Sequence, residues 1–205
     1  MEIIDAGGLS GHQNDPEKIA RDGYPFRMGE YLNFAFAVLQ KDPLKFFAYG
    51  FISAVIAGVP FLVYPAYAGF FIVADKIKKG EPYVFEDFFG GFKDKIGPLI
   101  IASIVAQLLI FVGLLLCILP GIYLAIAWSF AIPFVLFYTG DFWQALELSR
   151  KVITKNWFGF FALVLVAALL SGLGVILCFV GIFLTLPIFY LSIYAAYEDV
   201  VGTGK

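Results

Sequence analysis

The fold is decided by residues 96–140, which read IGPLIIASIVAQLLIFVGLLLCILPGIYLAIAWSFAIPFVLFYTG and contain no Lys, Arg, Asp or Glu. A helix needs about 20 apolar residues to cross the hydrocarbon of a bilayer, so this stretch is too long for one span and suits two. Residues 46–74 and 156–197 also lack all four charged residue types. Together the three stretches predict an all-α polytopic membrane bundle of about six transmembrane helices, arranged as three hairpins.

The first of these hairpins is the shortest. Two short or tilted helices fit residues 46–74 if the flanking Lys45, Lys76 and Lys78 extend their side chains toward the lipid headgroups. A single kinked span is the alternative.

Composition supports a membrane protein and excludes several other classes. Hydrophobic residues make up 61% of the 205 residues and charged residues 15%, and the mean hydropathy is +0.88, whereas a soluble domain is about half apolar and a quarter charged. The net charge of −2 argues against a nucleic-acid partner. Cys117 and Cys178 lie in apolar runs and His12 stands alone, so we expect no metal site and no cofactor.

The basic residues of the connectors predict the topology. They are Lys76, Lys78, Lys79, Lys93 and Lys95 in the first connector, and Arg150, Lys151 and Lys155 in the second. Short, positively charged loops stay on the cytoplasmic side. We therefore expect a multi-pass protein of the bacterial inner membrane with both connectors and both termini in the cytoplasm.

An internal repeat coincides with the hairpins. The segments GVPFLVYP (residues 58–65), GLLLCILP (113–120) and GVILCFVG (174–181) share their spacing. Gly and Pro are the residues at which chains turn. The predicted hairpin turns comprise Gly58, Pro65, Gly113, Pro120, Gly121, Gly174 and Gly181. The repeats, near 29–79, 80–139 and 140–200, form one transmembrane domain (29–200) between a polar N-terminal arm (1–28) and a short tail (201–205).

An amphipathic segment precedes each hairpin, near residues 30–40, 84–95 and 141–155. Apolar residues gather on one face of a helix while the charged residues lie elsewhere, which is typical of helices at a membrane interface. The residues predicted to face the membrane interface or a partner are Phe85, Phe88, Phe89, Phe92, Phe142, Leu146 and Trp157.

Chemistry-bearing residues are sparse, and we predict that the chain is not an enzyme. The paired carboxylates Glu86 and Asp87 lie near lysines on a polar face and have the character of a solvated surface. Within the apolar stretches Gln107, together with Ser103, is the candidate polar contact, expected to bond across a helix interface.

These observations leave two functions open. The first is an accessory or scaffold component that contacts membrane lipids and either a protein partner or a second copy of itself. The second is a passive transporter or channel for a small neutral or lipidic solute. A polar cavity around Gln107 would favour transport, whereas a packed bundle with an exposed apolar groove would favour the accessory role.

Three motifs carry a family resemblance. They are Gly80-Glu-Pro with Phe88-Phe-Gly-Gly-Phe-Lys93, then Leu119-Pro-Gly-Ile-Tyr123, then Ala145-Leu-Glu-Leu-Ser-Arg150. Their order and spacing over residues 43–200 resemble an uncharacterised family of bacterial six-helix integral membrane proteins, related to the membrane domain of some glycerophosphoryl diester phosphodiesterases. The resemblance implies a membrane bundle without a settled activity, and the N-terminal arm matches no part of its pattern.

Overall fold

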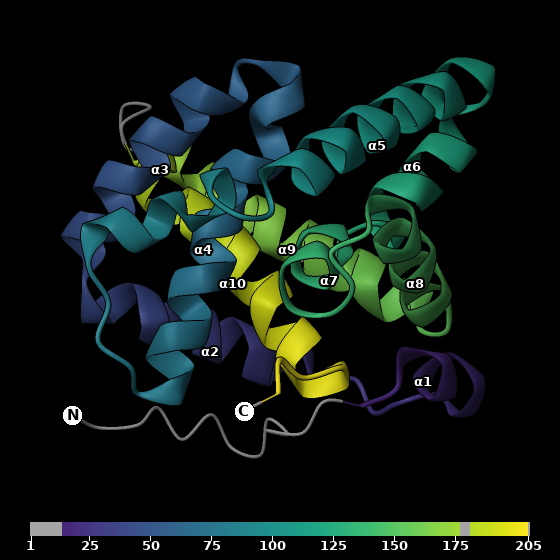
Figure 1. Ribbon diagram of the computed structural model, residues 1–205, viewed down its shortest axis with the longest axis horizontal. Helices are drawn as coiled ribbons and strands as arrows, with labels where there is room; N and C mark the ends of the chain where they lie inside the picture. The colour runs from purple at the N-terminus through teal and green to yellow at the C-terminus, as the bar shows by residue number, and fades with distance from the viewer. Residues whose placement is uncertain (1–13, 177–180, 205) are drawn as a thin grey trace.

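The computed structural model describes residues 14–176 and 181–204, and within them it contains helices and no strand. Ten α-helices and three short 3-10 helices follow one another in the order shown in Figure 1. Their bounds are α1 Pro16–Asp22, α2 Met28–Lys41, α3 Pro43–Ala57, η1 Pro60–Leu62, α4 Val63–Lys79, η2 Phe85–Phe92, α5 Ile96–Leu116, α6 Ile118–Ala127, α7 Ala131–Phe137, α8 Phe142–Thr154, α9 Trp157–Gly172, η3 Leu173–Ile176 and α10 Ile182–Val200. The all-α fold class is confirmed.

The number of membrane spans is the main difference from the prediction. Two stretches are long and apolar enough to cross a membrane, α5 and residues Ile118–Phe137, and the pair of α8 and α9 makes a third if it counts as one bent span. Helix α3 is apolar but short, at 15 residues. Length and composition therefore identify two or three candidate spans among the described residues, rather than the six expected.

Helix α10 is the centre of the molecule. It packs against α2, α3, α4 and α9, and twelve of its residues are buried, including the last ten of the helix. A helix that is apolar all round is one that other elements cover. Consequently α10 positions the ends of its neighbours around its own C-terminal turn.

Helices α5 and α6 form a hairpin that extends away from this centre, at the upper right of Figure 1. Only 28% of the most apolar window of α5 is buried. Leu115 and Leu116 at its end are 71% and 81% exposed. An isolated exposed leucine is ordinary, but a contiguous apolar surface of this kind marks contact with a membrane or a partner.

Two of the three predicted amphipathic segments are α-helices in the structure. Helices α2 and α8 occupy the regions near 30–40 and 141–155, and α8 meets α9 at a bend of 102°. The region near 84–95 instead forms η2, a 3-10 helix that packs along α4. This 3-10 helix lies very close to α4, since a Cβ atom on Gly69 of α4 would lie 1.8 Å from the carbonyl oxygen of Phe88.

Candidate functional site

Three buried carboxylates gather at one end of the bundle, around the C-terminal turn of α10. Glu198 is fully buried, and Asp199 and Asp75 are each 9% exposed. A buried carboxylate costs several kcal/mol unless it is paired and hydrogen-bonded, so its partners matter. We call these three residues and their partners the ionic network.

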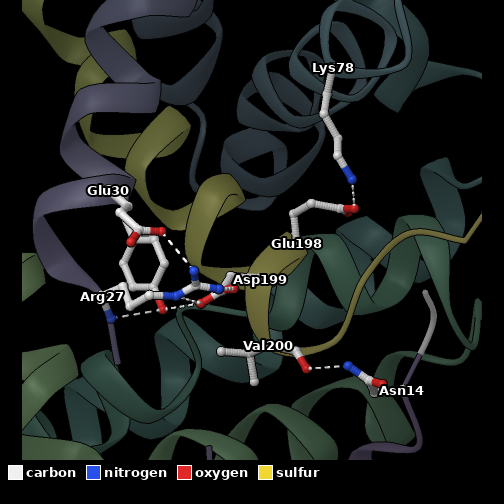
Figure 2. A network of polar contacts seen from close by, with 8 residues as sticks. Asn14, Arg27, Glu30, Lys78, Glu198, Asp199 and Val200 are labelled. Atoms are coloured by element: carbon white, nitrogen blue, oxygen red, sulfur yellow. Dashed lines mark hydrogen bonds and ion pairs between the residues drawn. The ribbon is translucent and has the colours of Figure 1, made fainter. Parts of the chain in front are cut away.

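Glu198 joins α10 to α4 and to the chain's last residues. Its carboxylate forms an ion pair with Lys78 of α4, and the two side chains point toward each other in Figure 2. Its second oxygen accepts a hydrogen bond from the backbone N–H of Thr203 at 2.8 Å. Both carboxylate oxygens are therefore satisfied without water.

Asp199 joins α10 to the start of α2. It forms an ion pair with Arg27, which also contacts Glu30 at 3.0 Å, so that Arg27 lies between two carboxylates (Figure 2). The hydroxyl of Tyr31 lies 2.7 Å from Asp199. Burial raises the pKa of Tyr31 above its ordinary value, so the hydroxyl stays protonated and donates a hydrogen bond to the carboxylate.

Asp75 completes the network from α4. It accepts hydrogen bonds from the hydroxyls of Tyr194 and Thr203 at 3.0 and 2.7 Å, and it pairs with Lys79 at 3.0 Å.

Asn14 bonds to the same end of α10. Its backbone N–H donates to the carbonyl of Val201 at 2.6 Å, and its side chain donates to the carbonyl of Val200, as Figure 2 shows. Segments from both ends of the chain thus meet at the ionic network.

The ionic network joins segments that are distant in the sequence. Each of its carboxylates is bonded to cations, hydroxyls or backbone N–H groups of the protein itself. Among the described residues no group of three or more His, Cys, Asp or Glu could hold a metal ion. The ionic network therefore links α2, α4, α10 and the chain's last residues.

A second polar contact lies far from the ionic network, at the tip of the α3–α4 hairpin. Ser103 and Gln107 of α5 both donate to the carbonyl oxygen of Pro60 in η1, at 3.1 and 2.5 Å. The side-chain nitrogen of Gln107 also lies 2.7 Å from the hydroxyl of Ser103. Gln107 thus bonds across the interface between α5 and η1.

Beside this contact is an open groove of about 590 Å³. It is lined by Pro60, Phe61, Ile104, Gln107, Leu108, Ile110, Phe111 and Leu114. All of these side chains except that of Gln107 are apolar, and the Gln107 amide nitrogen is bound to Pro60. The groove is therefore an apolar recess in the surface and not a polar cavity.

The predicted turn residues lie close to the turns, but several lie inside helices. Gly58 is at the C-terminal end of α3, as expected for a turn. Pro65 lies within α4, Gly113 within α5, and Pro120 and Gly121 within α6, because the second hairpin reverses at the extended residue Cys117. Gly174 is in η3 and Gly181 precedes α10, and residues 177–180 between them lie outside the described part of the chain.

Two glycine pairs of the repeat instead lie face to face across hairpins. A Cβ atom on Gly113 would lie 3.0 Å from the backbone nitrogen of Gly121. One on Gly174 would lie 2.5 Å from the carbonyl carbon of Gly181. These positions permit close backbone approach beside the turns, a role different from the predicted one.

The predicted interfacial residues do not form one outward face. Phe88 and Leu146 are 0% and 2% exposed, so for these two the prediction of a surface contact is wrong. The remaining five are partly buried, and four of them pack against the core, namely Phe85, Phe89, Phe142 and Trp157, while Phe92 ends η2. The apolar faces of η2 and α8 thus cover the protein's own core.

Ser149 of α8 is a buried polar residue with a role that the sequence did not reveal. Its hydroxyl donates to the carbonyl of Ala127 at 2.7 Å and accepts from the N–H of Phe130 at 3.1 Å. These two backbone groups flank the break between α6 and α7, where the helical hydrogen bonds are interrupted. Ser149 therefore stabilises that break.

No protein-family model, curated protein or solved structure matches this chain.

Proposed function

We propose that the chain is a non-catalytic integral membrane protein of the bacterial inner membrane that works through lipid and protein contacts, as an accessory or scaffold component of a membrane assembly. The observation that carries this proposal is the projecting α5–α6 hairpin. Its exposed apolar residues include Leu108, Phe111 and Leu115, which are 58%, 59% and 71% exposed. Burial of such a surface in lipid or against another helix removes a large apolar area from water.

We infer that six membrane-inserted helices form three hairpins, with both termini on the cytoplasmic side. The ionic network supports this topology, because it brings residues near both ends of the chain and the basic end of α4 to one end of the bundle. The second connector lies there too, since Lys155 donates to the carbonyl of Arg21 at 2.8 Å. Basic segments gathered at one end fit the rule that such loops stay in the cytoplasm.

The element order supports the proposed triplication. The same pattern, a short helical segment followed by a helical hairpin, occurs three times along the chain. The three units are α2–α3–α4, then η2–α5–α6 with α7, then α8–α9–α10. The proposed kinship with the bacterial membrane-protein family rests on its three sequence motifs alone.

The alternative is a passive transporter or channel for a small neutral or lipidic solute, and the geometry around Gln107 gives little support to the transport of a polar one. Transport of a polar solute needs polar groups that are free to exchange water for solute. Ser103 and Gln107 are instead bonded to Pro60 and to each other, beside an apolar groove.

Purification from native membranes in mild detergent, followed by mass spectrometry, tests this function. We expect the chain to remain in the membrane pellet after carbonate treatment and to retain a stoichiometric protein partner or a second copy of itself. Leu115→Ser should weaken the retention of the partner, because it places a polar side chain on the exposed apolar surface of the hairpin. Lys18→Ser on α1 is the control, and it should leave the retention of the partner unchanged. Release of the chain from the membrane by carbonate would contradict membrane integration. Purification of the chain as a monomer without any bound protein would contradict the accessory role.

A further inference from the structure

The α3–α4 hairpin is too short to cross the membrane beside α5. Helix α5 has 21 residues and α3 has 15. At a rise of 1.5 Å per residue these lengths correspond to about 31 and about 22 Å. The hydrocarbon core is about 30 Å thick, so α5 can cross it and α3 cannot.

Hydrogen bonds place the tip of this hairpin against the middle of α5. The carbonyl of Pro60 in η1 accepts from Ser103 and Gln107, and both residues lie near the midpoint of the helix Ile96–Leu116. If α5 crosses the bilayer, the tip lies near the bilayer centre.

The chemistry of the tip suits that depth. Residues 59–62 read VPFL and carry no polar side chain, and Val59 and Phe61 are 37% and 47% exposed. Non-helical backbone within hydrocarbon is tolerated only where its polar groups are satisfied by the protein. The carbonyl of Pro60 meets this condition, since two side chains of α5 donate to it.

We propose that the α3–α4 hairpin is re-entrant, with its tip fixed near the middle of the membrane by Ser103 and Gln107, and that acyl chains of lipids from the opposite leaflet fill the groove beyond it. This inference rests on the membrane insertion proposed above. The groove lies between the tip and the outer half of α5, with Phe61, Phe111 and Leu114 among its walls. At that depth its apolar walls match an acyl chain rather than water or a polar solute.

Nitroxide labels on single cysteines of the full-length protein in lipid vesicles test the depth of the tip. Cys117, which is exposed at the end of α5, is labelled in a Cys178→Ser background. Phe61→Cys is labelled with both native cysteines replaced by serine. Collision rates with oxygen, which concentrates in hydrocarbon, and with a water-soluble nickel complex report the depth of each label.

We expect the label at position 61 to lie near the bilayer centre, deeper than the label at 117, with strong oxygen collisions from surrounding acyl chains. A label at 61 as shallow as that at 117 would mean that the hairpin crosses the membrane. Weak collisions with both reagents at 61 would mean that protein, not lipid, fills the groove. Strong nickel collisions at both positions would instead overturn membrane insertion itself, and with it the proposed function.

Discussion

The two ends of this molecule satisfy their polar groups in different ways. At the ionic network, the carboxylate of Glu198 is fully buried and has partners from other segments. At the hairpin tips the side chains are apolar and exposed, and the polar contact at η1 satisfies a backbone carbonyl from within the protein. The two ends therefore suit different solvents, water and headgroups around the first and hydrocarbon around the second.

The largest effect should come from breaking the buried pair of Glu198 and Lys78. Glu198→Ala leaves Lys78, whose side chain is 18% exposed, without its carboxylate, and loss of one partner of a buried pair costs about 3–5 kcal/mol. For a chain of this size that lowers the thermal midpoint by roughly 6–20 °C. Thermal unfolding in detergent measures this shift.

The matched control is the exposed pair Glu147 and Arg150, whose side chains are 36% and 41% exposed. Glu147→Ala should change stability by about 1 kcal/mol or less, because water screens such pairs. Equal losses from the two variants would show that the ionic network behaves as an ordinary charged surface.

The next effect tests how closely η2 packs on α4. Gly69→Ala would place a Cβ atom 1.8 Å from the carbonyl oxygen of Phe88 and 2.6 Å from the hydroxyl of Tyr49. The backbone has to shift to relieve this clash, so we expect a loss of about 1–3 kcal/mol, measured by the same thermal unfolding. Gly29→Ala on α2, where a Cβ atom meets nothing within 4 Å, should be neutral or slightly stabilising, and an equal loss there would contradict this account.

The sequence predicted the helical class and the position of α2 and α8, because charge-free runs and apolar periodicity are local signals. It missed the ionic network, whose partners Arg27 and Asp199 are 172 positions apart. The available signal for this network was that an acidic residue directly follows two of the charge-free stretches, Asp75 after the first and Glu198 after the third. Periodicity also could not say what covers an apolar face, so Phe88 reads the same whether it faces lipid or the core.

A smaller effect concerns the hairpin tip. The carbonyl of Pro60 accepts from Ser103 and Gln107 and also from the backbone N–H of Val63, so it keeps a partner when either side chain is lost. The double variant Ser103→Ala/Gln107→Leu removes both side-chain donors, and we expect a loss of about 1–2 kcal/mol. This loss should be smaller than the two single losses added together, because each single variant already breaks the hydrogen bond between Ser103 and Gln107. Unfolding of the three variants in lipid nanodiscs measures the coupling, and strictly additive losses would mean that the two donors act independently.

The smallest effect is a pH dependence at η2, where Asp87 pairs with Lys76 at 2.8 Å and accepts from the N–H of Val84 at 2.9 Å. Burial alone would raise the pKa of Asp87, but the hydrogen bonds and charge of these partners outweigh it, so the pKa lies below its ordinary value. A lowered pKa in the folded state means that the stabilisation is complete above the ordinary carboxylate range and is lost as the pH falls through the folded value. We therefore expect the thermal midpoint of the native protein to fall more steeply below about pH 4 than that of Asp87→Asn, which has no proton to gain. If the thermal midpoints of the two proteins fall with pH at the same rate, the pair of Asp87 and Lys76 does not stabilise the packing of η2 against α4. The contrast between the strongly bonded ionic network and the more weakly held η2 would then lose its support.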